Sequence, residues 1–192
     1  MSHHRKITYK LEELEPHYRM ASPEALEPLP RNPVHVVLDN LRSAFNVGSI
    51  FRTCDAGAAA HLHLCGMTAY PPNLKLQKTA LGAMDYVPWT YHETTAAALE
   101  HLRAQGIPVV AVEAVKDAAV HDAYPWPFDT GVAVVFGNEV TGIGEETLAQ
   151  CDAVVAIPMQ GYKNTINVAT AFGIVLFEIL RQWKLDNRTG QR

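Results

Sequence analysis

Short apolar runs alternate with amphipathic and polar stretches along most of the chain. Runs rich in Val, Ile and Leu predict buried β-strands, and they are Val34–Leu38, His61–Cys65, Val87–Tyr91, Pro108–Val115, Val132–Phe136 and Ala153–Ile157. Helices are predicted between them, namely one that ends near Ala58 and others at Thr79–Met84, Thr95–Gln105, Gly144–Gln150 and Ile166–Trp183. This alternation predicts an α/β fold with a mostly parallel sheet and helices on both faces.

Residues 34–192 are predicted to form one domain, preceded by an arm at residues 1–33. The arm holds five of the twelve prolines, so only a short helix, at about Lys10–Tyr18, fits before an extended linker. Two interpretations of the arm stay open: a solvated segment, or one that packs on a partner or contacts substrate. Gly66–Lys78 and Lys116–Thr130 are predicted to be irregular.

Composition narrows the cellular setting. A chain of 192 residues with 48% apolar content can bury a sizeable core. The three cysteines lack CxxC spacing, which argues against a disulfide framework or a zinc site and favours a reducing compartment. Met1–Lys10 has no apolar leader, and the run Ile166–Leu180 is too short to span a bilayer. We therefore expect a cytoplasmic protein with no membrane contact.

Charge and histidine spacing limit the ligands. The net charge of −4 argues mildly against a nucleic-acid partner, so any RNA is expected on a local basic patch. The nine histidines show no metal-ligand spacing along the chain, and no metal is expected. His61 and His63 alternate along a predicted strand and should point to one face.

Two loops that follow strands have unusual chemistry for simple connections. The first is Gly137–Gly142, and the second is Pro158–Thr165, which runs directly into the last predicted helix. Ligands of open α/β sheets bind at the carboxyl ends of strands, so we expect these loops to form a site. The glycines would let the backbone of the first loop lie against a planar ligand.

Individual polar residues near these loops have both capping and functional explanations. Asn46 is suited to cap the first helix, and Glu139 to cap the helix predicted at Gly144–Gln150. Asn164 or Thr165 would cap the last helix, which leaves Asn167 to fix the neighbouring loop or a ligand. Arg52 is harder to explain structurally, because a guanidinium in the first turns opposes the helix dipole. Its position indicates a phosphate or carboxylate ligand.

Three segments together resemble a known family. In order and spacing they are similar to the three motifs of the SpoU/TrmH branch of the SPOUT RNA methyltransferases. The segments are LDNLRSAFNVGSIFRTCDAGAA, VVFGNEVTGIGEETLAQCD and IPMQGYKNTINVATAFGIVLFE. The resemblance covers about Val34–Trp183. It implies a C-terminal trefoil knot, a homodimer, S-adenosyl-L-methionine as methyl donor, and methylation of a ribose 2′-hydroxyl in tRNA or rRNA.

The resemblance also assigns roles to individual residues. The catalytic positions fall on Asn46, Arg52, Glu139 and Asn167. The donor is expected between the two loops, held by Gly137, Ile157, Met159, Gly161, Thr165 and Ile166. Thr165 stands where the family has Ser, which keeps the hydroxyl and adds a methyl group. The short arm favours tRNA over rRNA, because it cannot hold the extra N-terminal RNA-binding domain of some relatives.

The sequence leaves two alternatives for the role of Arg52 and more than one for the overall function. The resemblance makes Arg52 the base, but an arginine pKa above ~12 favours binding of phosphate and of the developing alkoxide instead. The alternatives to a methyltransferase are a catalytically silent RNA-binding scaffold of the same fold and a flavodoxin-like nucleotide-binding protein. The apolar content of Ile166–Trp183 on more than one side predicts that this helix lies in the dimer interface.

Overall fold

A computed structural model describes residues 30–189 of the chain, with side chains to residue 185. The predictions for residues 1–29 lie outside the described residues. The first strand begins at Asn32, two residues before the predicted start.

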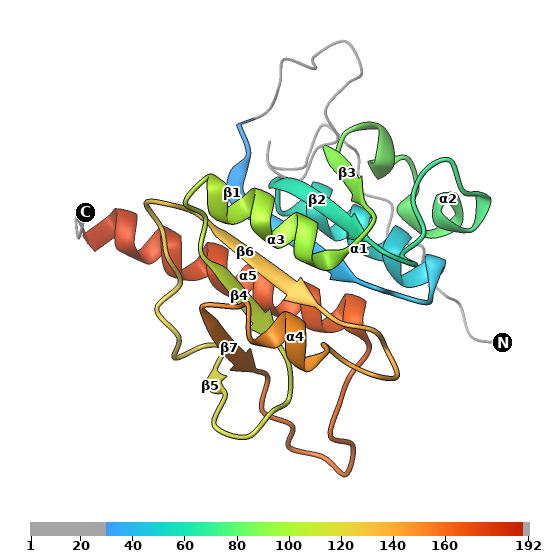
Figure 1. Ribbon diagram of the computed structural model, residues 1–192. Helices are drawn as coiled ribbons and strands as arrows, with labels where there is room; N and C mark the ends of the chain where they lie inside the picture. Colours follow the sequence, from blue (N-terminus) through green and yellow to red (C-terminus); the bar gives the residue numbers. More distant parts are fainter. Residues whose placement is uncertain (1–29, 190–192) are drawn as a thin grey trace, which may run out of the picture. The chain divides into compact units, whose positions relative to one another are not determined.

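Within residues 30–189, seven strands form one sheet in the order β3-β2-β1-β6-β4-β7-β5 (Figure 1). Their bounds are β1 Asn32–Asp39, β2 Ala59–Cys65, β3 Trp89–His92, β4 Val109–Val112, β5 Ala119–Val120, β6 Val132–Phe136 and β7 Ala153–Ala156. Every strand pairing is parallel. The prediction of an α/β fold with a mostly parallel sheet is confirmed, whereas the trefoil knot stays a prediction.

Helices cover both faces of this sheet, as predicted. The helices are α1 Ala44–Ala56, α2 Leu74–Ala80, α3 Thr95–Ala104, α4 Glu145–Leu148 and α5 Val168–Thr189, with a 3-10 turn, η4, at Ala83–Asp85. One apolar cluster joins the sheet to α1, α2 and α5, and a second joins it to α3 and the α4 region. Figure 1 shows α3 in front of the sheet and α5 behind it.

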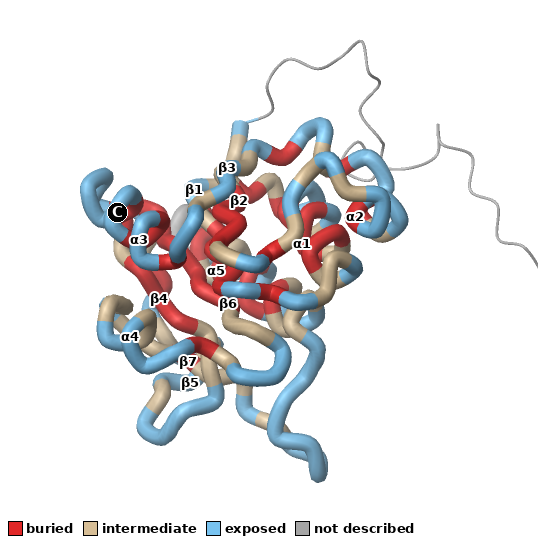
Figure 2. The backbone as a smooth tube through the Cα atoms, turned by 45° about the vertical axis from the view of Figure 1, so that its right-hand side comes forward, coloured by how far each residue is buried: buried red, intermediate tan, exposed pale blue. Residues whose placement is uncertain are grey.

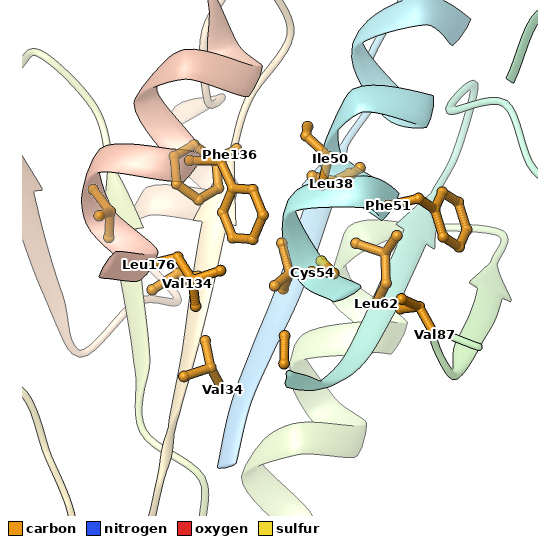
Figure 3. Packing of buried hydrophobic residues seen from close by; sticks show 14 of the residues in the cluster. Val34, Leu38, Ile50, Phe51, Cys54, Leu62, Val87, Val134, Phe136 and Leu176 are labelled. Carbon is orange, nitrogen blue, oxygen red and sulfur yellow. The ribbon is translucent and has the colours of Figure 1, made fainter. Parts of the chain in front are cut away.

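The larger core lies between the sheet and the α1–α5 layer. In α1, the buried residues Val47, Ile50, Phe51 and Cys54 follow the helical spacing that places side chains on one face. Phe136 of β6 meets Phe172 of α5 edge to face, with ring centroids 5.6 Å apart. Figure 3 shows Ile50 and Cys54 of α1 and Phe136 of β6 among the side chains between the helices and the central strands. The middle of the sheet is buried, whereas most of α2 and the loop that leads into α5 are exposed (Figure 2).

Several predicted boundaries are wrong for local reasons. The helix predicted at Thr79–Met84 is instead α2, because the Asn73 side chain accepts a hydrogen bond from the Lys75 N–H and starts the helix there. Leu81 ends it in a left-handed conformation, with φ of 49°. The segment Lys116–Thr130, predicted to be irregular, contributes the short strand β5 at the sheet edge. The last helix begins two residues after the predicted Ile166.

Five histidines gather on the sheet face that α3 covers incompletely: His35, His61, His63, His92 and His101. His63 Nε2 lies 3.2 Å from His35 Nδ1, and His63 Nδ1 lies 3.0 Å from His92 Nε2. Burial, followed by the neighbouring histidines, lowers the pKa of His61 to about 4 and that of His63 to about 2. His61 and His63 share one face, as predicted.

Within residues 30–189, no group of three or more His, Cys, Asp or Glu side chains is placed to hold a metal ion. The same part of the chain contains no helix with the length and apolar character needed to cross a membrane.

Candidate functional site

A cavity of about 1180 Å³ opens where the carboxyl ends of β1, β6, β4 and β7 meet. Its wall comes from four segments: the start of α1, the end of β4, the loop after β6, and the loop after β7 with the start of α5. Parallel strands place these ends at one edge of the sheet, which is the usual ligand site of such folds.

The N-terminus of α1 is held by a carboxylate from the loop after β6. Ser43 is the N-cap, since its hydroxyl accepts a hydrogen bond from the Asn46 N–H at 3.3 Å. The Glu139 carboxylate accepts from the Arg42 and Ser43 N–H groups at 2.8 and 3.1 Å, and from the Asn46 side-chain amide at 2.8 Å. An anion is favourable here, because helix N-termini present unpaired N–H groups and a positive dipole end.

The start of α5 is linked to the same network. The Asn167 amide donates to Asn46 Oδ1 at 3.0 Å, while Asn167 Oδ1 accepts from the Ala169 N–H at 2.9 Å. Asn167 is therefore the N-cap of α5. Glu139, Asn46 and Asn167, which lie far apart in the sequence, thus form one hydrogen-bonded chain along the cavity wall.

Backbone contacts fix the loop after β6. Asn138 and Gly142 exchange two backbone hydrogen bonds, and Asn138 Oδ1 accepts from the Val140 and Thr141 N–H groups. The Asn138 side chain also donates to the Asn40 carbonyl at 2.7 Å, which joins this loop to the end of β1. A Cβ at Gly137 would lie 2.4 Å from the Gly142 carbonyl carbon, so the loop itself excludes any side chain there.

The remaining walls combine apolar side chains with a few cations. The apolar surface comes from Val112, Phe136, Ile143, Ile157 and Met159. Positive charge comes from Arg42 and Lys163. Pockets for cofactors commonly have this composition, with apolar walls and a small number of polar groups that fix orientation.

Glu139 carries the main electrostatic feature of the site. Partial burial acts to raise the pKa of this carboxyl, but the hydrogen bonds from Arg42, Asn46 and Ser43 outweigh it and hold the pKa below its ordinary value. Glu139 is therefore ionised at neutral pH and is a poor proton carrier there.

Most residues singled out from the sequence line this cavity: Asn46, Gly137, Glu139, Ile157, Met159, Thr165, Ile166 and Asn167. Arg52 and Gly161 are not in its lining, and Arg52 is exposed on α1.

The predicted capping roles are wrong in each case. Ser43, and not Asn46, caps α1, because Asn46 lies within the first turn of the helix. Asn167 caps α5 in place of Asn164 or Thr165. Glu139 faces α1, whereas the N-cap position of α4 is Gly144, and no side chain caps that helix.

Among the polar and charged residues of the wall, sequence reasoning did not single out Arg42, Ser43, Glu113 and Lys163. Glu113 directly follows β4, so the rule that ligands gather at strand ends could have found it. Arg42 and Ser43 lie in the stretch between the first strand and Asn46, where no local pattern distinguishes them from an ordinary connection.

Comparisons with known proteins give matches over most of the described part of the chain. A family model described as the SpoU rRNA Methylase family matches residues 33–177. A 23S rRNA (guanosine-2′-O-)-methyltransferase from Vibrio vulnificus is 32% identical over 151 residues, which are 79% of this chain and 60% of that enzyme. A tRNA (guanosine(18)-2′-O)-methyltransferase from Thermus thermophilus is 33% identical over 147 residues, with 77% of this chain and 74% of the enzyme covered.

A solved structure, the AdoMet-bound rRNA methyltransferase from Sinorhizobium meliloti, superposes with a TM-score of 0.73 at 29% identity. The match covers 85% of this chain and 61% of that one. The chain thus spans about 60% of the length of the Vibrio and Sinorhizobium relatives.

Proposed function

The chain belongs to the SpoU family of RNA methylases, and from that premise we propose that it methylates a ribose 2′-hydroxyl of RNA with S-adenosyl-L-methionine. The observation that carries the proposal is the hydrogen-bonded chain Glu139–Asn46–Asn167 along the cavity at the sheet edge. It joins one residue from each of the three segments that resemble the family motifs.

The residues of the cavity fit the methyl donor. The cavity volume of about 1180 Å³ exceeds the roughly 300–1,000 Å³ of ordinary ligand pockets, which leaves room for the donor and part of an RNA nucleotide. Ile157, Met159 and Ile166 offer apolar surface, and Arg42 and Lys163 suit a carboxylate. When bound, the donor supplies a methyl group on a sulfonium, which an attacking oxygen can displace.

In this proposal the polar chain positions the reacting groups. Glu139 holds the start of α1 against the loop after β6, and it acts as a positioning residue because its lowered pKa disfavours proton transfer. Asn46 and Asn167 fix each other and keep the starts of α1 and α5 at the cavity. Transfer from sulfur to oxygen is an in-line displacement, so such positioning supplies much of the rate.

Arg52 fits the reaction through a second copy of the chain. Arg52 is exposed on α1. Its neighbour Thr53 lies against α5, because a Cβ at Gly173 would be 3.9 Å from the Thr53 Cγ2 atom. On α5, Ile174 and Phe177 are 39% and 51% exposed. We place the homodimer interface on this α1–α5 face, with the partner's Arg52 at the cavity, where it binds phosphate and stabilises the developing alkoxide.

Mixed dimers test this arrangement. In a dimer of Arg52→Ala and Asn46→Ala chains, one site keeps its own Asn46 and receives an intact Arg52 from the other chain. We expect coexpression to restore activity that neither variant has alone. If Arg52 acts within its own subunit, both sites of the mixed dimer stay inactive. A stable monomer in light scattering at micromolar concentration would contradict the proposed dimer interface.

The substrate is proposed as tRNA in preference to rRNA, in the cytoplasm. Calorimetry with S-adenosyl-L-methionine, followed by methyl incorporation into unmodified tRNA and rRNA, tests donor and substrate separately. A catalytically silent scaffold would bind RNA without incorporating label. The flavodoxin-like alternative is excluded by the family membership.

A further inference from the structure

Glu113 is a carboxylate in the cavity wall that the proposed reaction does not use. It directly follows β4, and its backbone N–H donates to the Val155 carbonyl of β7 at 3.0 Å. Its Oε1 accepts from the Ala114 N–H and its Oε2 from the Ile143 N–H, both at 2.9 Å. The side chain is thus held in one orientation at the edge of the cavity.

The sheet order places Glu113 away from the reacting end of the site. β6 lies between β4 and β1, so at roughly 4.8 Å per strand the end of β4 is about 10 Å from the end of β1. Asn46 belongs to the helix that follows β1. Around Glu113 the wall is largely apolar, with Val112, Ile143 and Ile157 lining the cavity. A planar purine base fits such walls, with its ribose beside the carboxylate.

The free hydrogen-bonding capacity of Glu113 matches a vicinal diol. Each carboxylate oxygen has two lone pairs, and backbone N–H groups use one on each oxygen. The two oxygens can therefore accept from two adjacent hydroxyl groups. We propose that Glu113 binds the 2′- and 3′-hydroxyls of the donor's ribose, an inference that rests on the proposed use of S-adenosyl-L-methionine. An acidic residue at a strand end performs this task in other nucleotide-binding α/β proteins.

The amino-acid end of the donor is a poorer match for Glu113. There the ammonium and a carboxylate sit on one carbon, so attraction of the first brings the second close to a like charge. Arg42 and Lys163 line other parts of the cavity and favour that carboxylate. The diol brings hydrogen-bond donors without a negative charge.

Glu113 also supports the loop after β6, and the experiment must separate the two roles. Gly142, with φ of +67°, lies so close that a Cβ there would be 2.6 Å from Glu113 Oε2. Loss of the carboxylate could loosen this loop and weaken every ligand alike. A contact with the diol would instead weaken only ligands that carry the diol.

The test is a calorimetric binding cycle without RNA. The ligands are S-adenosylhomocysteine, 5′-methylthioadenosine, which lacks the amino-acid end, and the 2′,3′-dideoxy form of each. They are titrated into the wild type, Glu113→Gln and the control Glu146→Gln, an exposed residue of α4 outside the cavity lining. We expect Glu113→Gln to weaken both diol ligands by about tenfold or more and both dideoxy ligands by less than twofold, the range for a hydrogen bond to a charged group.

Four outcomes overturn the inference. Equal weakening of diol and dideoxy ligands assigns Glu113 to loop support alone, and weakening of S-adenosylhomocysteine without 5′-methylthioadenosine assigns it to the ammonium. If the wild type binds diol and dideoxy ligands equally, the diol contact is absent whether or not Glu113→Gln folds. A wild type that binds none of the ligands overturns the proposed function along with the inference, which distinguishes that failure from the others.

Discussion

Replacement of Glu139 by Gln should destabilise the fold as well as the site. The substitution keeps the size of the side chain but removes its charge and turns one acceptor oxygen into a donor NH₂ group. That group then faces either the Arg42 or the Ser43 N–H, both of which now donate to the carboxylate. One backbone donor at the start of α1 is left without a partner.

The expected loss follows from these contacts. A hydrogen bond to a charged group contributes about 1.5–3 kcal/mol. Because Glu139 is exposed to solvent, we expect a loss of about 1 kcal/mol for each of the two hydrogen bonds that the substitution weakens most. The total of about 2 kcal/mol corresponds to a fall in Tm of about 4–8 °C for a domain of this size. Thermal and urea denaturation measure it, with Glu100→Gln on the exposed side of α3 as the matched control.

The pH dependence of this loss gives a sharper check. Because the folded-state pKa of Glu139 is lowered below its ordinary value of 4.5, its contribution is present above that pH and disappears as the pH falls through the folded pKa. The difference between wild type and Glu139→Gln should therefore be constant near neutrality and shrink in acid. Equal stability of the two proteins at pH 7 would refute the role of Glu139 as the anion that holds α1.

Three further predictions concern other residues. Gly137→Val should unfold the loop after β6 or the whole domain, while Gly144→Ala, whose Cβ meets nothing within 4 Å, should melt like wild type; a well-folded Gly137→Val protein would contradict the close contact with Gly142. The histidine cluster should make unfolding easier as the pH drops below 6.5, because the lowered pKa of His63 means that the unfolded chain binds more protons, and His63→Gln should flatten that slope in urea titrations at pH 5–8. Arg52→Ala should keep donor affinity in calorimetry but slow single-turnover methyl transfer by about 10²–10³, with little rescue by Lys; a wild-type rate would exclude Arg52 from the reaction.

Local patterns predicted the strands better than the helix starts. Buried runs such as Val132–Phe136 are continuous and apolar because helices cover both sides of the sheet, and that signal is contained in the segment itself. Helix starts depend on which polar side chain reaches the free N–H groups. Near α5, the predicted caps were Asn164 and Thr165, whereas the structure uses Asn167. Asn167 also contacts Asn46, and no local pattern contains that contact.

The candidate site was predicted through the order of three motifs, and its internal contacts were not. Glu139 and Asn46 are 93 positions apart, and only the parallel arrangement of β1 and β6 brings their loops together. The histidine cluster was missed for the same reason, since its members come from three strands and a helix that become neighbours only in the sheet. Glu113 lies outside the three motif segments, although its place near the end of a predicted strand was visible, and Arg42 lies inside the first segment without a feature that marked it.

The position of the transferred methyl group is the most direct test of the function proposed for this chain. RNA incubated with the protein and labelled S-adenosyl-L-methionine is hydrolysed in alkali, where a 2′-O-methylated ribose cannot attack the adjacent phosphodiester. We predict that the label is recovered in an alkali-resistant dinucleotide from one site of the RNA, and that tRNA incorporates more label than rRNA. Label recovered only in mononucleotides, or no label in either RNA, would contradict ribose methylation.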